Sequence, residues 1–499
     1  MDNLINKILL FACFGLLTAN VFADDPKSDK VTVDSTETSK QEIINQRKEN
    51  RSKLKEKATA LVEMMTLDEK LALVDMNSQP VERFEIPAHH WWNEALSGVG
   101  RNGFATQFPQ PIAMASTWNP MLIEEMALAI SSEARAKYHA ANEPTRRYRG
   151  LTIWSPTINL ARDPRWGRNE ESFGEDPWLT SRIALGFVKG LQGYDSQYLK
   201  TVATVKHFIA NNHEYGRKTD RPDVPEQFLR DYYMIPFKAA VEEAGVQSIM
   251  TAYSGINDIP CTIHKWLLTD VLRHEWGFDG TIVTDVGAPA YLSWRHKVTA
   301  NETESSAEMI KAGVNVICHF NDFRAQVKAA IENGLITEEQ LEQAVIQNLT
   351  TRMELGQVID DNDNPYRNIP ISVVGSSEHR AIARKIAQQG TILLKNENDL
   401  LPINTEKFKR IVVTGPYGNV AHLGGYSGTP TITPITPLAG ISKVASELGI
   451  EIINPTSGEE IKYDPNTTMI VYVGGFDIED ADENRDLLNL ELKKNQLED

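Results

Sequence analysis

The sequence predicts an α/β protein with a (β/α)8 TIM-type barrel followed by a shorter second α/β unit. Short runs rich in β-formers alternate with helical patterns through most of the 499-residue chain, which favours parallel strands in a barrel or a doubly wound sheet. Polar, chemically capable residues directly follow several of these strands, where barrel enzymes build their sites. No GxGxxG follows the first strand, so a dinucleotide-binding sheet loses its main support.

The N-terminus has the features of an export signal. Lys7 gives a weakly positive start, and residues 8–18 form an apolar run that is too short to span a bilayer as a helix. The small residue Ala23 offers a cleavage position, so residues 1–23 are predicted to be a removed signal peptide. A lipoprotein cysteine at Cys13 is the alternative. Export predicts a periplasmic or extracellular protein, and no later segment predicts a membrane span.

The barrel is predicted at residues 58–357, after a polar leader at residues 24–57 that runs into a helix. Strands are predicted at Leu151–Trp154, Thr201–Val205, Gln247–Thr251, Gly280–Thr284 and Val314–Cys318. Helices are predicted at Met121–Ala140, Ser181–Leu191, Glu226–Glu243, Ser306–Ala312 and Asp322–Asn333. In the helix Glu226–Glu243, apolar residues recur at three- and four-residue steps, which is typical of a helix packed on a sheet.

Turn-forming residues predict a linker at residues 358–376, followed by a second α/β unit at residues 377–499. Within this unit, helices are predicted at Glu378–Gln389 and Leu438–Leu448, and strands at Arg410–Thr414 and Met469–Val473. The chain ends where another helix is expected to begin. The second unit is therefore predicted to be incomplete.

Composition and charge limit the classes of partner. A formal net charge of −17 and a sequence pI near 5.2 argue against a nucleic-acid partner, which needs a basic surface. His213 and Glu214 are adjacent and lack the spacing of a zinc site, so neither a metal nor a cofactor is predicted. After removal of the signal, Cys261 and Cys318 remain. Their pairing stays open, as does the oligomeric state.

Three segments of the predicted barrel carry residues suited to chemistry. Asp285 follows the strand Gly280–Thr284, where a carboxylate is held rigidly enough to act as a nucleophile. Capping of the next helix explains its position equally well from spacing alone. Lys206 and His207, at the end of another strand, can donate hydrogen bonds to neighbouring sugar hydroxyls. Arg168 is a candidate ligand contact in a segment dense in Arg and carboxylate, where a buried ionic network is the structural alternative.

A fourth segment, Trp91-Trp-Asn-Glu94, combines aromatic faces with a carboxylate, as a sugar site requires; a loop with buried tryptophans is the alternative. With these segments in view, the chain resembles glycoside hydrolase family 3, the β-glucosidase and β-xylosidase group. The motifs that carry the resemblance follow the family's order from Ala58 to the C-terminus. They are Met65-Thr-Leu-Asp-Glu-Lys, Trp91-Trp-Asn-Glu-Ala-Leu-Ser-Gly-Val, Phe108-Pro-Gln-Pro-Ile, Arg162-Asp-Pro-Arg-Trp-Gly-Arg, Lys206-His-Phe, Trp276-Gly-Phe-Asp-Gly up to Asp285, and Leu423-Gly-Gly-Tyr-Ser-Gly.

The resemblance implies a barrel followed by an α/β sandwich, with the site between them, and the activity of a retaining exo-acting β-glycosidase. Asp285 resembles the nucleophile of a double displacement, with the two carboxyls roughly 5–5.5 Å apart. The implied substrate is a terminal β-linked xylose or glucose of an oligosaccharide, and the Trp91 segment looks more like the xylosidase branch. The residues that resemble the family's glycone-binding set are Glu94, Arg101, Arg168, Lys206, His207, Arg217 and Tyr253.

The family draws its acid/base residue from the second unit, often within a pattern EGxDR, and this chain has Glu483-Asn-Arg-Asp-Leu there. Glu483 aligns best, and Glu479 is the alternative. Asn484 and Leu487 depart from the expected Gly and Arg, and Val286 replaces the Trp or Cys that usually follows the nucleophile. Two other functions stay open. One is a β-N-acetylglucosaminidase, disfavoured because this chain lacks the pattern KHFPGHG; the other is a catalytically impaired sugar-binding fragment.

Overall fold

The structure is a computed structural model that describes residues 37–143, 145–358, 362–455, 462–474 and 481–490. The predicted signal peptide, the first part of the leader and Glu479 lie outside these residues. In the part of the chain that is described, no helix is both long enough and apolar enough to span a bilayer. Cys261 and Cys318 are buried and do not form a disulfide.

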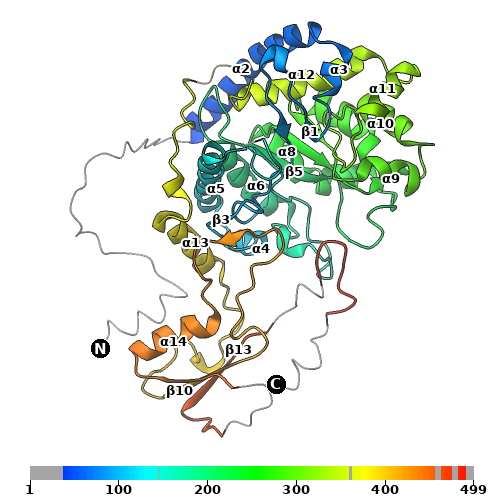
Figure 1. Cartoon of the computed structure of the whole chain (residues 1–499). Coiled ribbons are helices and arrows are strands. Elements are labelled where there is room, and N and C mark those ends of the chain that lie inside the picture. The colour runs from blue at the N-terminus through cyan, green and yellow to red at the C-terminus, as the bar shows by residue number, and fades with distance from the viewer. Residues whose placement is uncertain (1–36, 144, 359–361, 456–461, 475–480, 491–499) are drawn as a thin grey trace.

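Residues up to 358, here called the N-terminal domain, contain most of the helices and the largest sheet (Figure 1). Its helices are α2 (Glu37–Glu63), α3 (Leu67–Leu71), η1 (Glu82–Phe84), α4 (Pro111–Ala115), α5 (Pro120–Ala140), η2 (Asn169–Glu171), α6 (Pro177–Gln192), α7 (Glu226–Phe228), η3 (Leu229–Tyr233), α8 (Ile235–Glu242), η4 (Cys261–Ile263), η5 (Trp266–Glu275), α9 (Ala288–Trp294), α10 (Glu302–Ala312), α11 (Arg324–Glu332) and α12 (Glu338–Glu354). Its strands are β1 (Asn77–Ser78), β2 (His89–His90), β3 (Phe104–Ala105), β4 (Thr152–Ile153), β5 (Val202–Phe208), β6 (Ser248–Thr251), β7 (Gly255–Ile256), β8 (Ile259–Pro260) and β9 (Thr281–Val283).

The central sheet is parallel, in the order β4-β5-β6-β9, as the alternation of strands and helices predicts. Every residue of these four strands is buried, which is typical of a sheet covered on both faces. The predicted strand Val314–Cys318 is present only as single parallel bridges, from Val316 to Val283 and from Ile317 to Asp75. The sheet therefore continues beyond β9, but with fewer regular pairs than the sequence predicts.

Two glycines let the neighbouring helices α5 and α6 approach closely. A Cβ at Gly186 would overlap the Pro120 carbonyl, and one at Gly190 would overlap the Glu124 carbonyl. Ile183 and Phe187 of α6 belong to the main core. The close approach of α5 and α6 therefore depends on the absence of side chains at Gly186 and Gly190, and not on apolar periodicity.

The polar leader predicted at residues 24–57 is wrong from residue 37 onward, because α2 already begins at Glu37. Arg47 and Arg51 are buried on this helix. Arg47 Nε donates to the Asp195 carbonyl at 2.6 Å, and Arg51 forms an ion pair with Glu354 on α12. Of the residues buried on α2 before Leu54, two are arginines and only Ile44 is apolar, so the hydrophobic pattern gave no helical signal there.

The single helix predicted at Glu226–Glu243 is also corrected, because it is broken into α7, the π-helical turn η3 and α8. The Met234 N–H donates to the Leu229 carbonyl, five residues earlier. Pro236, which has no N–H to donate, lies in the first turn of α8. The apolar spacing is satisfied by both arrangements, so it did not reveal the break.

Residues from 391 onward, here called the C-terminal unit, form a small parallel sheet in the order β12-β10-β13. Phe408, Val413 and Ala445 are among its core residues. It pairs with the N-terminal domain through β11 and β3, where Thr429 lies opposite Phe104. Figure 1 shows this unit at one end of the molecule. Its elements are η7 (Glu397–Asp399), β10 (Arg410–Thr414), β11 (Thr429–Pro430), α14 (Pro437–Glu447), β12 (Glu451–Ile453) and β13 (Thr468–Tyr472).

Helices η6 (Ile371–Val373) and α13 (Ser377–Gly390) lie between these two parts of the chain. The sequence assigned α13 to the second unit, but this helix packs on α4 and α5. Ile386 is fully buried in the main core. A Cβ at Gly390 would overlap the Ala113 carbonyl. The helix therefore belongs by its contacts to the N-terminal domain.

We expect Gly186→Ala to destabilise the protein by about 1–3 kcal/mol, because the added methyl group forces α5 and α6 apart. Gly440→Ala on α14 is the control, since a Cβ there would lie at an ordinary 3.7 Å from Ile435 Cγ2. The control is expected to keep or raise stability, because Ala favours a helix more than Gly. Thermal unfolding midpoints of both variants check this. Equal midpoints for Gly186→Ala and the native chain would contradict it.

Candidate active site

One cavity of about 270 Å³ brings together residues from both parts of the chain. Lys206 and His207 belong to β5, while Tyr253 and Asp285 follow β6 and β9 by two residues each. The C-terminal unit contributes an aromatic ring and a carboxyl group. The cavity is lined by Trp92, Glu94, Arg101, Trp154, Lys206, His207, Arg217, Lys218, Met250, Tyr253, Asp285, Val286, Tyr291, Phe320, Tyr426, Glu483 and Asn484.

Asp285 lines this cavity and has only 9% of its surface exposed. Burial raises the pKa of its carboxyl to about 6, although the Arg217 cation opposes the shift. Its Oδ1 accepts the N–H of Val286 at 2.8 Å. Gly287, not Asp285, is the N-cap residue of α9, and α9 has no side-chain cap. The alternative role of Asp285 as a helix cap is therefore wrong.

Glu483 reaches the same cavity from the C-terminal unit. Its Oε1 lies 2.9 Å from Arg217 Nη2, and its Oε2 accepts the Tyr426 hydroxyl at 2.6 Å. Arg168 Nη1 is 3.9 Å away. Burial alone would raise the pKa of Glu483, but Arg168 and Arg217 outweigh it and hold that pKa well below its ordinary value. Glu483 is therefore ionised in the unliganded protein.

Arg168 is placed behind the cavity and does not line it. Its guanidinium makes two hydrogen bonds of 2.7 Å to the Glu171 carboxylate, and its side chain is 1% exposed. The buried ionic network expected for this segment is thus present. Arg168 acts on the cavity through its charge, since its Nη1 lies 3.4 Å from His207 Nε2.

His207 lies beside Asp285, with 3.7 Å between its Nε2 and Asp285 Oδ2. Burial and the neighbouring Arg168 cation keep the pKa of His207 well below its ordinary value. Its Nδ1 is 3.1 Å from Asn159 Oδ1. The imidazole is therefore neutral at physiological pH and offers a hydrogen bond rather than a charge.

Glu94 and Trp92 form another part of the cavity wall, where the Trp92 indole N–H donates to Glu94 Oε1 at 2.5 Å. Burial raises the pKa of Glu94, against the influence of Lys206. Among the described residues, no group donates to the buried Oε2 of Glu94. Arg101 Nη1 donates to the Tyr148 hydroxyl at 3.0 Å. This wall therefore presents an unused acceptor beside the cations of Arg101 and Lys206.

Tyr253 is buried in the same cavity, and burial together with the Asp285 carboxylate raises the pKa of its hydroxyl well above the ordinary value. Its hydroxyl donates to the Val286 carbonyl at 2.7 Å, and the Arg217 guanidinium lies 4.8 Å from its ring centroid. Eight of the nine predicted site residues thus line one cavity, and Arg168 lies directly behind it.

Sequence reasoning missed Tyr426, although the motif Leu423-Gly-Gly-Tyr-Ser-Gly that carries it was noted. Tyr426 has the positive φ of 58° that non-Gly residues rarely adopt. Its ring lies 4.8 Å from Lys206 Nζ and 5.3 Å from the Arg101 guanidinium. The aromatic residues Tyr291 and Phe320 were missed as well, because nothing local in the sequence separates them from other loop aromatics.

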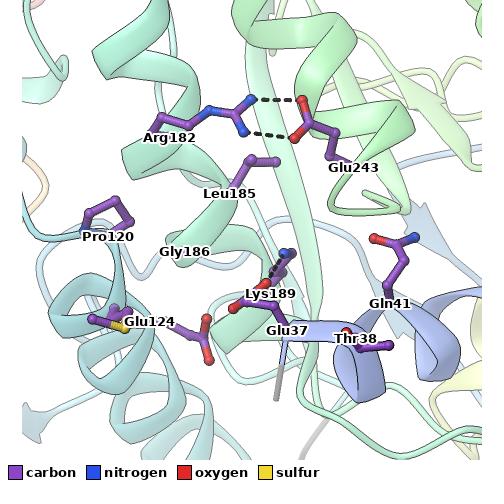
Figure 2. A pocket seen from close by; sticks show the side chains of 11 residues that line it. Glu37, Thr38, Gln41, Pro120, Glu124, Arg182, Leu185, Gly186, Lys189 and Glu243 are labelled. Atoms are coloured by element: carbon purple, nitrogen blue, oxygen red, sulfur yellow. Dashed lines mark hydrogen bonds and ion pairs between the residues drawn. The ribbon is translucent and has the colours of Figure 1, made fainter. Parts of the chain in front are cut away.

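A larger pocket of about 480 Å³ lies elsewhere, between α2, α5, α6 and α8. Figure 2 shows that its charged groups bind one another, with Arg182 paired to Glu243 and Lys189 to Glu37. Lys40 likewise pairs with Glu124, at 2.6 Å. The charged groups of this larger pocket neutralise one another. The smaller cavity around Asp285 is therefore the candidate active site.

The described residues contain no group of three His, Cys, Asp or Glu side chains arranged to hold a metal ion. His213, considered above beside Glu214, points instead to Asp220, with 3.0 Å between Nε2 and Oδ2. Carboxyl groups, cations and aromatic rings are prominent among the side chains that line the cavity.

Residues 41–351 match the family described as "Glycosyl hydrolase family 3 N terminal domain", and residues 391–498 match "Glycosyl hydrolase family 3 C-terminal domain". The chain belongs to glycosyl hydrolase family 3. The resemblance predicted from the motifs is confirmed.

Several relatives of this family 3 chain are named as xylosidases. A xylan 1,4-beta-xylosidase of Xylanibacter ruminicola is 35% identical over 403 residues, which cover 79% of this chain and 47% of that protein. Beta-D-xylosidase 3 of Arabidopsis thaliana is 33% identical, over 89% of this chain and 60% of its own length. The chain thus spans 47% and 60% of the length of these two relatives.

Solved structures of the family superpose on most of the chain. A GH3 exo-beta-xylosidase (XlnD) in complex with a xylobiose aziridine probe gives a TM-score of 0.80 at 31% identity. The match covers 89% of this chain and 60% of that one. A beta-glucosidase of Listeria innocua in complex with glucose gives a TM-score of 0.74 at 26% identity, over 89% of this chain and 67% of that one.

We expect Tyr426→Phe to raise the pKa of Glu483, because the lost hydroxyl stabilises the carboxylate. Tyr148→Phe is the matched control, since the Tyr148 hydroxyl bonds Arg101 rather than Glu483. Carboxyl-carbon NMR titration of protein labelled at Glu measures the shift, with Glu483→Gln assigning the resonance. An unchanged titration of this resonance in Tyr426→Phe would contradict the hydrogen bond.

Proposed function

We propose that this chain is a retaining, exo-acting β-glycosidase that removes terminal xylose or glucose units from β-linked oligosaccharides. The observation that carries the proposal is the pair of carboxyls, Asp285 and Glu483, brought to one small cavity from opposite parts of the chain. A volume of about 270 Å³ lies at the lower end for ligand pockets and suits one terminal sugar ring better than a long chain.

In the proposed double displacement, Asp285 attacks the anomeric carbon and forms a glycosyl ester, while Glu483 protonates the leaving oxygen. Glu483 then takes a proton from water, which hydrolyses the ester and frees Asp285. The position of Asp285 just after a buried strand supports its role as nucleophile, because a strand end is more rigid than a loop. The neutral His207 beside it adds a hydrogen-bonding group without a second charge.

The electrostatics of the unliganded cavity favour one kind of substrate. Glu483 must carry a proton in the first step, but the Arg168 and Arg217 cations favour its ionised form. Activated aryl glycosides need little protonation of their leaving group. We therefore expect activity to be detected first on such substrates, and activity on disaccharides to be confined to lower pH.

The strand pairings support a barrel as the scaffold of this site. Beyond β9, Ile317 pairs with Asp75, which lies two residues before β1, and β1 pairs with β2. Asn93, just after β2, pairs with Ile153 of β4. We propose that these pairings close the sheet into a TIM-type barrel, and that the C-terminal unit is part of an α/β sandwich.

The proposed glycone contacts are Glu94, Arg101, Lys206, His207, Arg217 and Tyr253, with Arg168 acting through its charge. The unused Oε2 of Glu94 is suited to accept a sugar hydroxyl, while Lys206 and Arg101 are suited to donate. The names of several relatives support xylose as the first substrate to test. Since the substrate would be an extracellular polysaccharide fragment, the proposal agrees with export to the periplasm or the medium.

A 2-deoxy-2-fluoro xyloside or glucoside with a dinitrophenyl leaving group is expected to label Asp285 covalently, as peptide mapping would show. Only the ionised carboxyl attacks, so the labelling rate should fall as the pH falls through the pKa of about 6. Asp285→Asn should abolish labelling, whereas Asp220→Asn, at an exposed carboxyl, should not. An adduct on Glu483 would reverse the two roles.

We expect xylobiose or cellobiose to be hydrolysed to monosaccharides, with the β-anomer as the first product of a retaining reaction. Product analysis by chromatography and early-time NMR distinguishes the two sugars and the stereochemistry. Because the cavity fits one terminal unit, long xylan should be shortened only from its end. Faster internal cleavage of xylan than of xylobiose would contradict the exo-acting assignment.

A further inference from the structure

The side chain of Asp486 bonds the segment that carries Glu483 to the N-terminal domain. Its Oδ1 accepts the Gly167 N–H at 2.9 Å. Its Oδ2 accepts the N–H groups of Glu214 and Tyr215, at 2.8 and 3.0 Å. A single carboxylate thus bonds two separate loops of the N-terminal domain, three residues away from Glu483 in the chain.

These loops are shaped to receive the segment. A Cβ at the buried Gly167 would overlap the carbonyls of Arg485 and Asp482, so only glycine leaves room for the turn. The turn itself is closed by hydrogen bonds between the backbones of Asp482 and Arg485, at 2.8 and 3.0 Å. Just beyond Asp486, the Leu487 N–H donates to the Arg165 carbonyl at 2.7 Å.

Asn484, which departs from the family's Gly, is explained by the same turn. It has a φ of 75°, which Asn tolerates better than most residues. Its N–H donates to Glu214 Oε2 at 2.8 Å, and its Oδ1 accepts from Arg217 and Lys218, at 2.9 and 2.8 Å. The departure therefore keeps the backbone conformation and adds contacts to the N-terminal domain.

Glu214 links this fastening to the acid/base group. Its backbone N–H bonds Asp486, while its side chain pairs with Arg217 Nη1 at 3.0 Å and accepts the Trp166 indole N–H at 2.9 Å. Arg217 in turn holds Glu483. A displacement of Asp486 therefore moves both the segment that carries Glu483 and the residue that supports its ion pair.

We propose that Asp486 is the positioning residue of the acid/base group, which it holds over the cavity by bonding the N–H groups of Gly167, Glu214 and Tyr215. This inference rests on the proposed acid/base role of Glu483. Asp486 does not line the cavity, so it acts through Glu483 and not on the sugar. Its effect should therefore be greatest where the reaction depends on proton transfer.

The experiment compares Asp486→Ala and Asp486→Asn with Glu483→Gln as the benchmark. Asp482→Asn is the matched control, because it removes the same charge from the same turn while the backbone contacts remain. Each protein is assayed for kcat and KM on a dinitrophenyl β-xyloside and on xylobiose, across pH. A general acid contributes roughly 10²–10⁴-fold, so Asp486→Ala should lower kcat on xylobiose by about 10²-fold or more.

On the dinitrophenyl substrate, Asp486→Ala should lower the glycosylation rate far less, because that leaving group needs little protonation. Asp486→Asn keeps one acceptor oxygen, so its kcat on xylobiose should lie between those of Asp486→Ala and the native chain. The pH profile on xylobiose should change in the Asp486 variants and not in Asp482→Asn. Equal losses on both substrates with an unchanged pH profile would overturn the proposal in favour of a purely structural role.

Hydrogen exchange tests the fastening without relying on activity. The amides of Gly167, Glu214 and Tyr215 should exchange faster in Asp486→Ala than in Asp482→Asn, and unchanged exchange would overturn the proposal. A native chain inactive on both substrates would refute the proposed function. The exchange result would then still decide whether Asp486 holds the segment.

Discussion

The ion pair between Arg217 and Glu483 joins the two parts of the chain inside the cavity, and the electrostatics of the site depend on it. Arg217 is 2% exposed and shares the buried interior with a second cation, Arg168. Glu214 and Glu171 pair with these two arginines from within the N-terminal domain. Burying cations is favourable only when anions and hydrogen bonds surround them. The C-terminal unit supplies the further anion, Glu483, that faces both.

The same charges give the two carboxyls of the cavity different properties. Burial dominates at Asp285 and raises its pKa, while the cations dominate at Glu483 and lower its pKa. The Glu483 carboxylate also raises the pKa of Asp285, so the charge of one carboxyl affects the other. Loss of the Arg217 ion pair would raise the pKa of Glu483, because this cation is one of the two that hold that pKa low.

Much of the site could be predicted because parallel strands place their carboxyl ends at one edge of a sheet. Lys206, Tyr253 and Asp285 were located by that logic and by the family resemblance, and they line one cavity. The start of helix α2 at residue 37 could not be predicted, because two of the residues buried in its first half, Arg47 and Arg51, are charged. Their guanidinium groups bond a carbonyl and a carboxylate of residues far away in the chain. The break at η3 was hidden for a related reason, since apolar spacing is compatible with both a continuous and a broken helix.

The sequence by itself determined the family, the alternation of strands and helices, and the side chains available for chemistry, because these depend on local pattern and motif. Only the tertiary structure decided that Asp285 does not cap a helix, that Arg168 stands behind the cavity, and that Tyr426 reaches Glu483. It also decided that Asn484 is compatible with a turn where the family has Gly. These outcomes depend on contacts between residues far apart in the chain, such as Asp486 with Gly167, which no local pattern encodes.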